Sequence, residues 1–256
     1  MFVVGTEGAM SAEDEKNVIE QEIDNGADAL IIQPAAGEDT EEMLKDISQS
    51  IPVLLVESEP LGDKESPGIP VIQADNYSMG RTLAEELLKE YDGNLEGKTI
   101  GIAVETEALE ATRSRREGFM DGLEGSGADV RWSVSGAFGQ GRKSLEAQPT
   151  VDLVAALDDR SLTAAGKAAA KNDLHGALVY GIGNSSEAVY YLDIGVAECL
   201  VVPDEFSVGY QSLTKLSENL RRFFKSAESS TVTHTVIRKE NLFTEENQEI
   251  IYTMSQ

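Results

Sequence analysis

The sequence has one cysteine and two histidines among its 256 residues. Cys199 cannot form an internal disulfide, and its apolar neighbours, AECLVV, predict a small buried side chain. Neither His175 nor His234 stands beside a plausible nucleophile, and no G-x-S-x-G segment occurs. Histidine, cysteine and aspartate also never recur at the spacing of a metal site. We therefore expect no catalytic residue, no metal ion and no cofactor.

Basic residues and long apolar runs are also scarce. Lysine and arginine number 21 against 46 aspartates and glutamates, a formal net charge of −25, so nucleic acid and anionic membrane surfaces are unfavourable partners. No apolar run approaches the roughly 20 residues that span a bilayer, and the first residues, MFVVGTEGAM, lack the features of a secretory signal. We expect a chain that neither binds nucleic acid nor inserts directly into a membrane.

Short runs rich in valine and isoleucine alternate with segments of helical period, which predicts parallel strands joined by helices. The hydrophobic content of 41% is sufficient for one or two packed cores. The expected fold class is α/β and doubly wound. Strands are expected at 2–5, 29–34, 52–57, 70–75, 99–105, 130–135, 152–157, 177–182 and 197–202, and helices at 11–25, 39–48, 77–91, 109–124, 161–171, 185–193 and 206–226.

Two glycine-rich segments come close to nucleotide-binding motifs. Residues 136–144, GAFGQGRKS, have one residue too many for G-x-x-x-x-G-K-[ST], which would turn Lys143 away from the phosphates. Residues 180–186, YGIGNSS, lack the third glycine of a dinucleotide fingerprint. The sequence therefore does not support a nucleotide site.

Three arginines gather in TRSRREGF, residues 112–119. On a helix Arg113 and Arg116 share a face, whereas Arg115 points about 100° away from Arg116. One interpretation is a solvated basic patch that pairs with nearby glutamates. The other is that one arginine reaches a ligand at the carboxyl ends of the strands, where open α/β sheets bind ligands.

Several segments, in order, resemble a known family: ADALIIQPA, IPVLLVES, VIQADNYSMGRTLAEEL, GKTIGIAV, RSRREGF, VDLVAALDDRSLTAAGKAA, VYGIGNS, VVPDEFSVGYQSL and VIRKEN. Together they resemble the type I periplasmic binding proteins for sugars and the related effector domains of lactose-repressor-like regulators. The resemblance covers nearly the whole chain. It implies two α/β lobes joined by three crossovers, with a small polar ligand trapped as the lobes close.

The resemblance also implies the lobe boundaries. One lobe would comprise 1–75 with 204–235, and the other 76–203 with 236–256. The crossovers would fall at three places, with hinge residues Asp75, Asn76, Asp204 and Thr235.

Four positions match ligand contacts of the family. The second arginine of the R-x-R-x-x-G-F motif reaches the ligand, which implies Arg115 here, with Arg113 and Arg116 outward or structural. Phe138 matches an aromatic ring laid against the sugar, and Asp158 and Glu57 match residues that bind hydroxyl groups. Asp159 could cap the following helix, and it could exchange roles with Asp158.

Three positions depart from the family pattern. Ser58 stands where an arginine is common, Gly183 where an aspartate is, and Pro203 where a glutamine is. Asn184, with Asp204, Glu105 and Glu107 as further candidates, could offset the lost polar contacts. These departures count against an ordinary pentose or hexose, and the expected ligand is a carbohydrate, polyol or related polar molecule.

The resemblance begins at the family's second strand, which implies that the family's first strand-helix unit is missing from this sequence. In the usual strand order 2-1-3-4-5 that first strand is central, and its absence would expose apolar surface. The resemblance implies a non-enzymatic solute-binding protein that works outside the cytoplasmic membrane with the membrane subunits of an ABC importer. The alternative is the ligand-sensing domain of a lactose-repressor-like regulator or a receptor.

Overall fold

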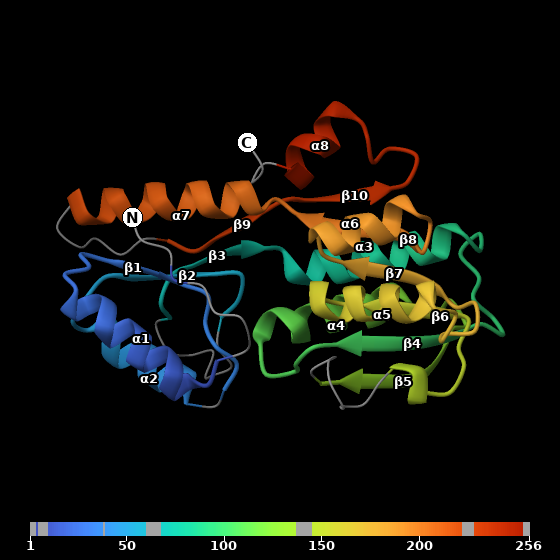
Figure 1. Ribbon diagram of the computed structural model, residues 1–256, viewed down its shortest axis with the longest axis horizontal. Helices are drawn as coiled ribbons and strands as arrows, with labels where there is room; N and C mark the ends of the chain where they lie inside the picture. The colour runs from blue at the N-terminus through green and yellow to red at the C-terminus, as the bar shows by residue number, and fades with distance from the viewer. Residues whose placement is uncertain are drawn as a thin grey trace. The chain divides into compact units, whose positions relative to one another are not determined.

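The computed structural model describes residues 4, 10–37, 39–59, 68–136, 145–221 and 228–252. Its helices are α1 (Ala12–Asp24), α2 (Thr40–Ser48), α3 (Asn76–Lys89), α4 (Glu110–Gly122), α5 (Asp159–Ala170), α6 (Ser186–Asp193), α7 (Glu205–Arg221) and α8 (Glu245–Tyr252), with a short 3-10 helix at Leu145–Ala147. Its strands are β1 (Leu30–Ile32), β2 (Val53–Val56), β3 (Val71–Ala74), β4 (Thr99–Val104), β5 (Asp129–Ser135), β6 (Leu153–Ala156), β7 (Leu178–Ile182), β8 (Ala197–Pro203), β9 (Ser230–Val232) and β10 (His234–Arg238). Figure 1 shows their arrangement.

The predicted alternation of strands and helices is confirmed between β1 and α7. The α/β fold class with parallel, doubly wound sheets is therefore confirmed as well. Strands β9 and β10 and helix α8 were not predicted. Apart from Val4, the expected strand at 2–5 lies outside the described residues, as do residues 137–144 of the glycine-rich segment.

The chain divides into two compact units. The first contains Met1–Gln73, Ala108–Ala111 and Ser207–Thr231, and the second contains Ala74–Glu107, Thr112–Phe206 and Val232–Gln256. The lobe boundaries and hinge residues implied by the resemblance stay a prediction. None of the helices in the described ranges is both long and apolar enough to cross a bilayer.

The first unit is built on a four-stranded sheet in the order β1-β2-β3-β9. Strands β1, β2 and β3 are parallel neighbours, with Leu30 opposite Val53 and Leu55 opposite Val71. Within the described part of the chain β1 is an edge strand, and the side chain of its central residue, Ile31, is 37% exposed. The first core therefore lies between this sheet and helices α1 and α2.

The second unit is built on a six-stranded sheet in the order β10-β8-β7-β6-β4-β5. Counted along the chain from β4, its parallel strands follow the order 2-1-3-4-5, and β10 is added antiparallel to β8. Parallel strands buried on both faces need continuous apolar runs, and β6 supplies one, with each of its four residues buried. The carboxyl ends of these strands therefore meet at one edge of the sheet (Figure 1).

Opposite faces of the second sheet carry different helices. Val179 of β7 belongs to a core cluster with residues of α5 and α6. The next residue, Tyr180, is fully buried, and β7 and β8 are in contact with α3. Because neighbouring residues of a strand point to opposite faces, α3 lies on the face away from α5 and α6.

A cluster of ion pairs around the buried Glu86 side chain ties β10 to α3. The guanidinium of Arg238 donates from Nε to Oε2 of Glu86 at 2.9 Å and from Nη1 to Oε1 of Glu90 at 2.8 Å. Lys89 also donates to Glu86, whose side chain is only 5% exposed. Burial alone would raise the pKa of the Glu86 carboxyl, but the hydrogen bonds from Lys89 and Arg238 outweigh burial and hold the pKa below its ordinary value of 4.5.

The Glu86 cluster predicts a loss of stability in acid. A depressed carboxyl pKa contributes stability that is present above about pH 4.5, the unfolded pKa, and is lost as the pH falls through the folded pKa. Glu86→Gln should therefore cost about 1–2 kcal/mol of unfolding free energy at pH 7, and this cost should shrink below about pH 4.5. Urea unfolding between pH 7 and pH 3 measures it.

The matched control is Glu85→Gln, because Glu85 makes only an exposed pair with Arg81. We expect its stability to follow the parent at every pH. A Glu86→Gln deficit that stays constant down to pH 3 would contradict the role of the charged cluster.

Candidate functional site

Arg115 lies where the carboxyl edge of the second sheet meets helices α3 and α4. Its Nε donates to Oδ1 of Asn76 in the first turn of α3 at 2.7 Å. Its Nη1 donates to the backbone oxygen of Leu157, one residue beyond the end of β6, at 3.2 Å. Two bonds to two different elements hold this half-buried guanidinium at the end of the sheet.

The two neighbouring arginines have another partner. Nε of Arg113 donates to the backbone oxygen of Glu107 at 3.0 Å, and Nη1 of Arg116 donates to the Glu107 carboxylate. Both therefore brace the loop before α4, whereas Arg115 alone of the three bonds to Asn76 and Leu157.

Two glycines bring α3 and α4 into backbone contact beside Arg115. A Cβ atom added to Gly80 of α3 would lie 1.8 Å from the backbone oxygen of Arg115, and one added to Gly118 of α4 would lie 2.0 Å from that of Tyr77. Phe119, which completes the R-x-R-x-x-G-F motif, is fully buried. The glycine and phenylalanine of the motif thus set the depth at which α4 packs, and with it the place of Arg115.

Asp158 stands two residues beyond the end of β6 and is the N-cap of α5. Its Oδ1 accepts from the backbone N–H of Ser161 at 2.8 Å, and its Oδ2 accepts from that of Glu105 at 2.7 Å. Burial raises the pKa of this carboxyl, although the two N–H donors and the charge of Arg115 act in the opposite direction. Each carboxylate oxygen keeps further acceptor capacity, so Asp158 can cap the helix and also accept from a ligand hydroxyl.

Of the two adjacent aspartates, Asp158 caps the helix and Asp159 is its first residue. Oδ1 of Asp159 accepts from the backbone N–H of Ser185 at 2.9 Å, which ties the loop after β7 to the start of α5. The expected cap role of Asp159 is therefore wrong: Asp158 is the cap, because Ser161 stands at the position that completes a capping box with it.

Gly183 and Asn184 follow β7 at the same edge. Gly183 has a φ of 154°, and a Cβ there would lie 2.4 Å from Oδ1 of Asp159. A side chain has no room at this position, which explains the departure from the family's aspartate, and only the backbone of Gly183 could serve a ligand. Asn184 is half-buried beside it.

Pro203 and the hinge positions lie near the ends of strands. Pro203 is buried at the end of β8 opposite His234 of β10, and it has no N–H to donate. Asp204 donates its N–H to the backbone oxygen of Thr233 at 3.0 Å, and Thr235 pairs with Val202. Asp75 caps α3 by accepting from the N–H of Ser78 at 3.0 Å.

In the first unit, Glu57 and Ser58 follow the carboxyl end of β2. Glu57 has a φ of 69°, the left-handed region, which a residue with a side chain adopts at a cost of about 1–2 kcal/mol. Such strain is characteristic of functional sites. Ser58 is 3% exposed, and its hydroxyl donates to the backbone oxygen of Glu59 at 2.9 Å and accepts from the N–H of Ala111 at 3.1 Å.

The sequence-predicted residues thus fall into two groups. The second unit brings Arg115, Asp158, Gly183 and Asn184 to one edge of its sheet, together with Asn76, whose bond to Arg115 was not predicted. Glu57 and Ser58 are neighbours in the first unit. Phe138 lies outside the described residues.

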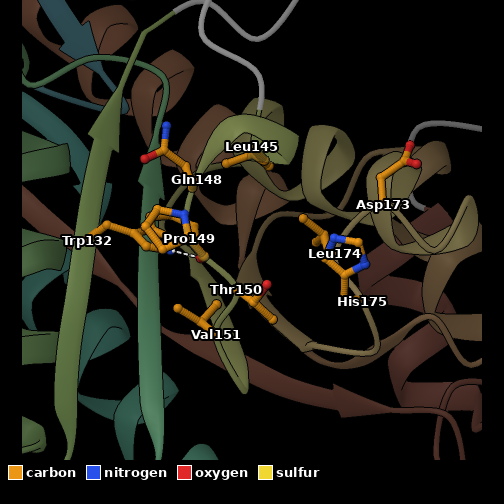
Figure 2. A pocket seen from close by; sticks show the side chains of 9 residues that line it. All are labelled: Trp132, Leu145, Gln148, Pro149, Thr150, Val151, Asp173, Leu174 and His175. Carbon is orange, nitrogen blue, oxygen red and sulfur yellow. Dashed lines mark hydrogen bonds between the residues drawn. The ribbon is translucent and has the colours of Figure 1, made fainter.

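A small surface hollow occurs elsewhere in the second unit, before the amino ends of β6 and β7. Figure 2 shows its lining residues, Trp132, Leu145, Gln148, Pro149, Thr150, Val151, Asp173, Leu174 and His175. Nε1 of Trp132 donates to the backbone oxygen of Pro149 at 2.8 Å across it. Its volume of ≈ 10 Å³ suits at most one water molecule, whereas ligand pockets span roughly 300–1,000 Å³. The hollow is therefore not a sugar site.

Cys199 is fully buried, as predicted, and burial raises the pKa of its thiol to about 12. No cluster of three or more histidine, cysteine, aspartate or glutamate residues in the described ranges is arranged to hold a metal ion. The chemistry of the edge is accordingly that of hydrogen bonding from a guanidinium, a carboxylate and backbone groups, which suits a ligand with several hydroxyl groups.

Several solved structures are similar to the chain. A carbohydrate-transporter solute-binding protein of Agrobacterium radiobacter, in complex with D-arabinose, is 20% identical with a TM-score of 0.79, over 94% of this chain and 84% of that one. An ABC-transporter solute-binding protein of Agrobacterium vitis with bound D-fucose is 19% identical with a TM-score of 0.79, over 97% and 87%. The myo-inositol-binding protein of Caulobacter, bound to myo-inositol, is 18% identical with a TM-score of 0.75, over 93% and 83%.

At these identities the solved structures establish the fold. No curated protein sequence matches the chain significantly. The sequence model of the periplasmic binding protein domain, however, matches residues 2–221, which is most of the chain. The chain therefore belongs to the periplasmic binding protein family.

Proposed function

We propose that the protein is the solute-binding component of an ABC importer and captures a sugar, polyol or related small polar molecule. The observation that carries the proposal is the placement of Arg115 beside Asp158 at the carboxyl edge of a parallel sheet. A guanidinium donates from a rigid fork to adjacent oxygens, and a carboxylate accepts from hydroxyl groups. A polyhydroxylated ligand offers both kinds of group side by side.

The family and the ligands of the similar structures support this choice. D-arabinose, D-fucose and myo-inositol are all small, uncharged and rich in hydroxyl groups. The regulator alternative has no comparable observation in its favour. Binding without catalysis is part of the proposal, as are a location outside the cytoplasmic membrane and the membrane subunits of the importer as partners.

The full ligand-binding set of the proposal is Arg115, Phe138, Asp158, Glu57, Ser58, Gly183, Asn184 and Pro203. In this scheme the ligand stabilises a closed state by its contacts, and the chain bends at Asp75, Asn76, Asp204 and Thr235. The strained backbone of Glu57 and the constrained φ of Gly183 support two of these positions.

The proposal is tested by thermal unfolding with D-arabinose, D-fucose, D-tagatose and myo-inositol, each alone in excess. A ligand present at 100 times its dissociation constant should stabilise the protein by about 2.7 kcal/mol, and Tm should rise accordingly. L-leucine serves as a control solute that lacks neighbouring hydroxyl groups. If none of the four hydroxylated probes raises Tm, the proposal is overturned. For any probe that raises Tm, isothermal titration gives the affinity.

A further inference from the structure

The buried side-chain amide of Asn76 accepts a hydrogen bond from Arg115 of the proposed site. Asn76 is 5% exposed and occupies the first turn of α3. Its Oδ1 receives the Nε–H of Arg115 at 2.7 Å, a short charge-assisted bond. Nε is the atom at which the guanidinium plane joins the side chain, so a bond there restricts the direction in which the remaining donors point.

The second bond of the guanidinium completes the restraint. Nη1 donates to the backbone oxygen of Leu157 at 3.2 Å, next to the proposed ligand residue Asp158. Asn76 belongs to α3 and Leu157 to the connection between β6 and α5, so the two bonds together define both the position and the plane of the group. Both acceptors are neutral oxygens, and these two bonds therefore orient the guanidinium without neutralising its charge.

The helix crossing makes this bond possible. Gly80 lies one turn after Asn76 on α3, and the space for its missing Cβ is filled by the backbone oxygen of Arg115 itself. The backbones of α3 and α4 therefore touch at the residue whose side chain Asn76 holds. A longer separation of the helices would move Oδ1 out of hydrogen-bonding range of Nε.

We propose that Asn76 is a positioning residue of the binding site, which holds the Arg115 guanidinium in its ligand-binding orientation and thereby sets the affinity for the ligand. The inference has two parts. The affinity part, that Asn76 sets the affinity for the ligand, rests on the proposed function. The positioning part, that Asn76 holds the Arg115 guanidinium in one orientation, does not. Asn76 acts through Arg115 and needs no contact of its own with the ligand.

The positioning part is tested without any ligand, by the Nε–H signals of arginine side chains in a ¹H–¹⁵N spectrum. Arg115→Lys identifies the Arg115 signal by its loss. We expect that signal to be sharp and protected from solvent exchange in the parent, and lost in Asn76→Leu, which removes the acceptor. Asn76→Asp keeps an acceptor oxygen at the same place and should keep the signal.

The matched control is Asn247→Leu. Asn247 is also a buried amide of the second unit, 6% exposed, and its Nδ2 donates to the backbone oxygen of Asn241 at 2.8 Å. This variant should lose stability and leave the Arg115 signal intact. An Arg115 signal that is unprotected in the parent, or unchanged in Asn76→Leu, would overturn the inference.

The affinity part is tested by titration with D-arabinose, D-fucose, D-tagatose and myo-inositol. Asn76→Leu should weaken binding about tenfold to a hundredfold, and Asn76→Asp should restore it to within about threefold of the parent. In an Arg115→Ala background Asn76→Leu should weaken binding no further, because the two residues act as a unit.

The outcomes separate the two proposals. If no probe binds the parent, sugar capture fails, while the Nε–H signals still decide whether Asn76 positions Arg115. If a probe binds the parent and Asn76→Leu loses the protected signal with its affinity unchanged, Asn76 does not set the affinity and the inference is wrong.

Discussion

Arg115→Ala should raise the dissociation constant about a hundredfold for any sugar or polyol that binds the parent. The substitution removes the charged donors of the proposed site. The bonds to Asn76 and Leu157 hold the Arg115 side chain at the end of β6. Binding therefore costs little of the conformational entropy of this side chain. Isothermal titration with the probe that raises Tm most gives the two dissociation constants.

The matched controls are the neighbouring arginines. Arg113→Ala and Arg116→Ala each remove the same charge, but both side chains bond to Glu107. Their affinities should stay within about threefold of the parent, because solvent-exposed charges are screened by salt and contribute little beyond their immediate neighbours. Equal losses in all three variants would assign the effect to net charge and contradict a specific role of Arg115.

The strands of the second unit could be predicted because of how a parallel sheet is buried. Residues of β6 and β7 meet helices on both faces, so nearly every position is apolar and the run is visible in the sequence. Strands β9 and β10 escaped because they mix threonine, serine and histidine with valine, and most of their residues are only partly buried or exposed. Both are edge strands, which leave a weaker hydrophobic pattern in the sequence than buried central strands do.

The sequence alone does not identify which of Arg113, Arg115 and Arg116 faces the sheet. Helical geometry separates Arg115 from Arg116 by direction, but only tertiary contacts identify which direction faces the sheet. The resemblance supplied that choice, and the structure shows the bonds that accompany it. The partner of Arg115, Asn76, stands 39 residues earlier, and its role depends on a helix crossing that no local pattern reveals.

The spacing of residues after Asp158 identifies the helix cap in the sequence itself. Asp158 precedes Ser161 by three residues, the spacing at which an N-cap and the N3 residue exchange hydrogen bonds. Applied to Asp159, the same spacing reaches Leu162, which cannot take part. The N-cap was therefore predictable, whereas the bond from Ser185 to Asp159 joins the loop after β7 to the start of α5 and was not.

Gly118→Ala should destabilise the protein by about 2 kcal/mol, although alanine is the better helix former. The added Cβ would lie 2.0 Å from the backbone oxygen of Tyr77 and 2.8 Å from its carbonyl carbon, so α3 and α4 have to move apart. Backbone atoms cannot rotate away as a flexible side chain can, so the overpacking cost exceeds the gain in helix propensity of about 1 kcal/mol. Denaturant unfolding measures the net loss.

The control is the same substitution in a helix with open space. Gly209 lies within α7, and a Cβ added there meets nothing within 4 Å. Gly209→Ala should therefore leave stability unchanged or raise it by up to about 1 kcal/mol. A Gly118→Ala protein as stable as the Gly209→Ala protein would show that the helices adjust freely at the crossing. In that case the place of Arg115 would have to be set by its two hydrogen bonds alone, and Gly118→Ala should then leave the ligand affinity unchanged. If the crossing is rigid, as its backbone contacts imply, the same substitution should weaken stability and ligand affinity together.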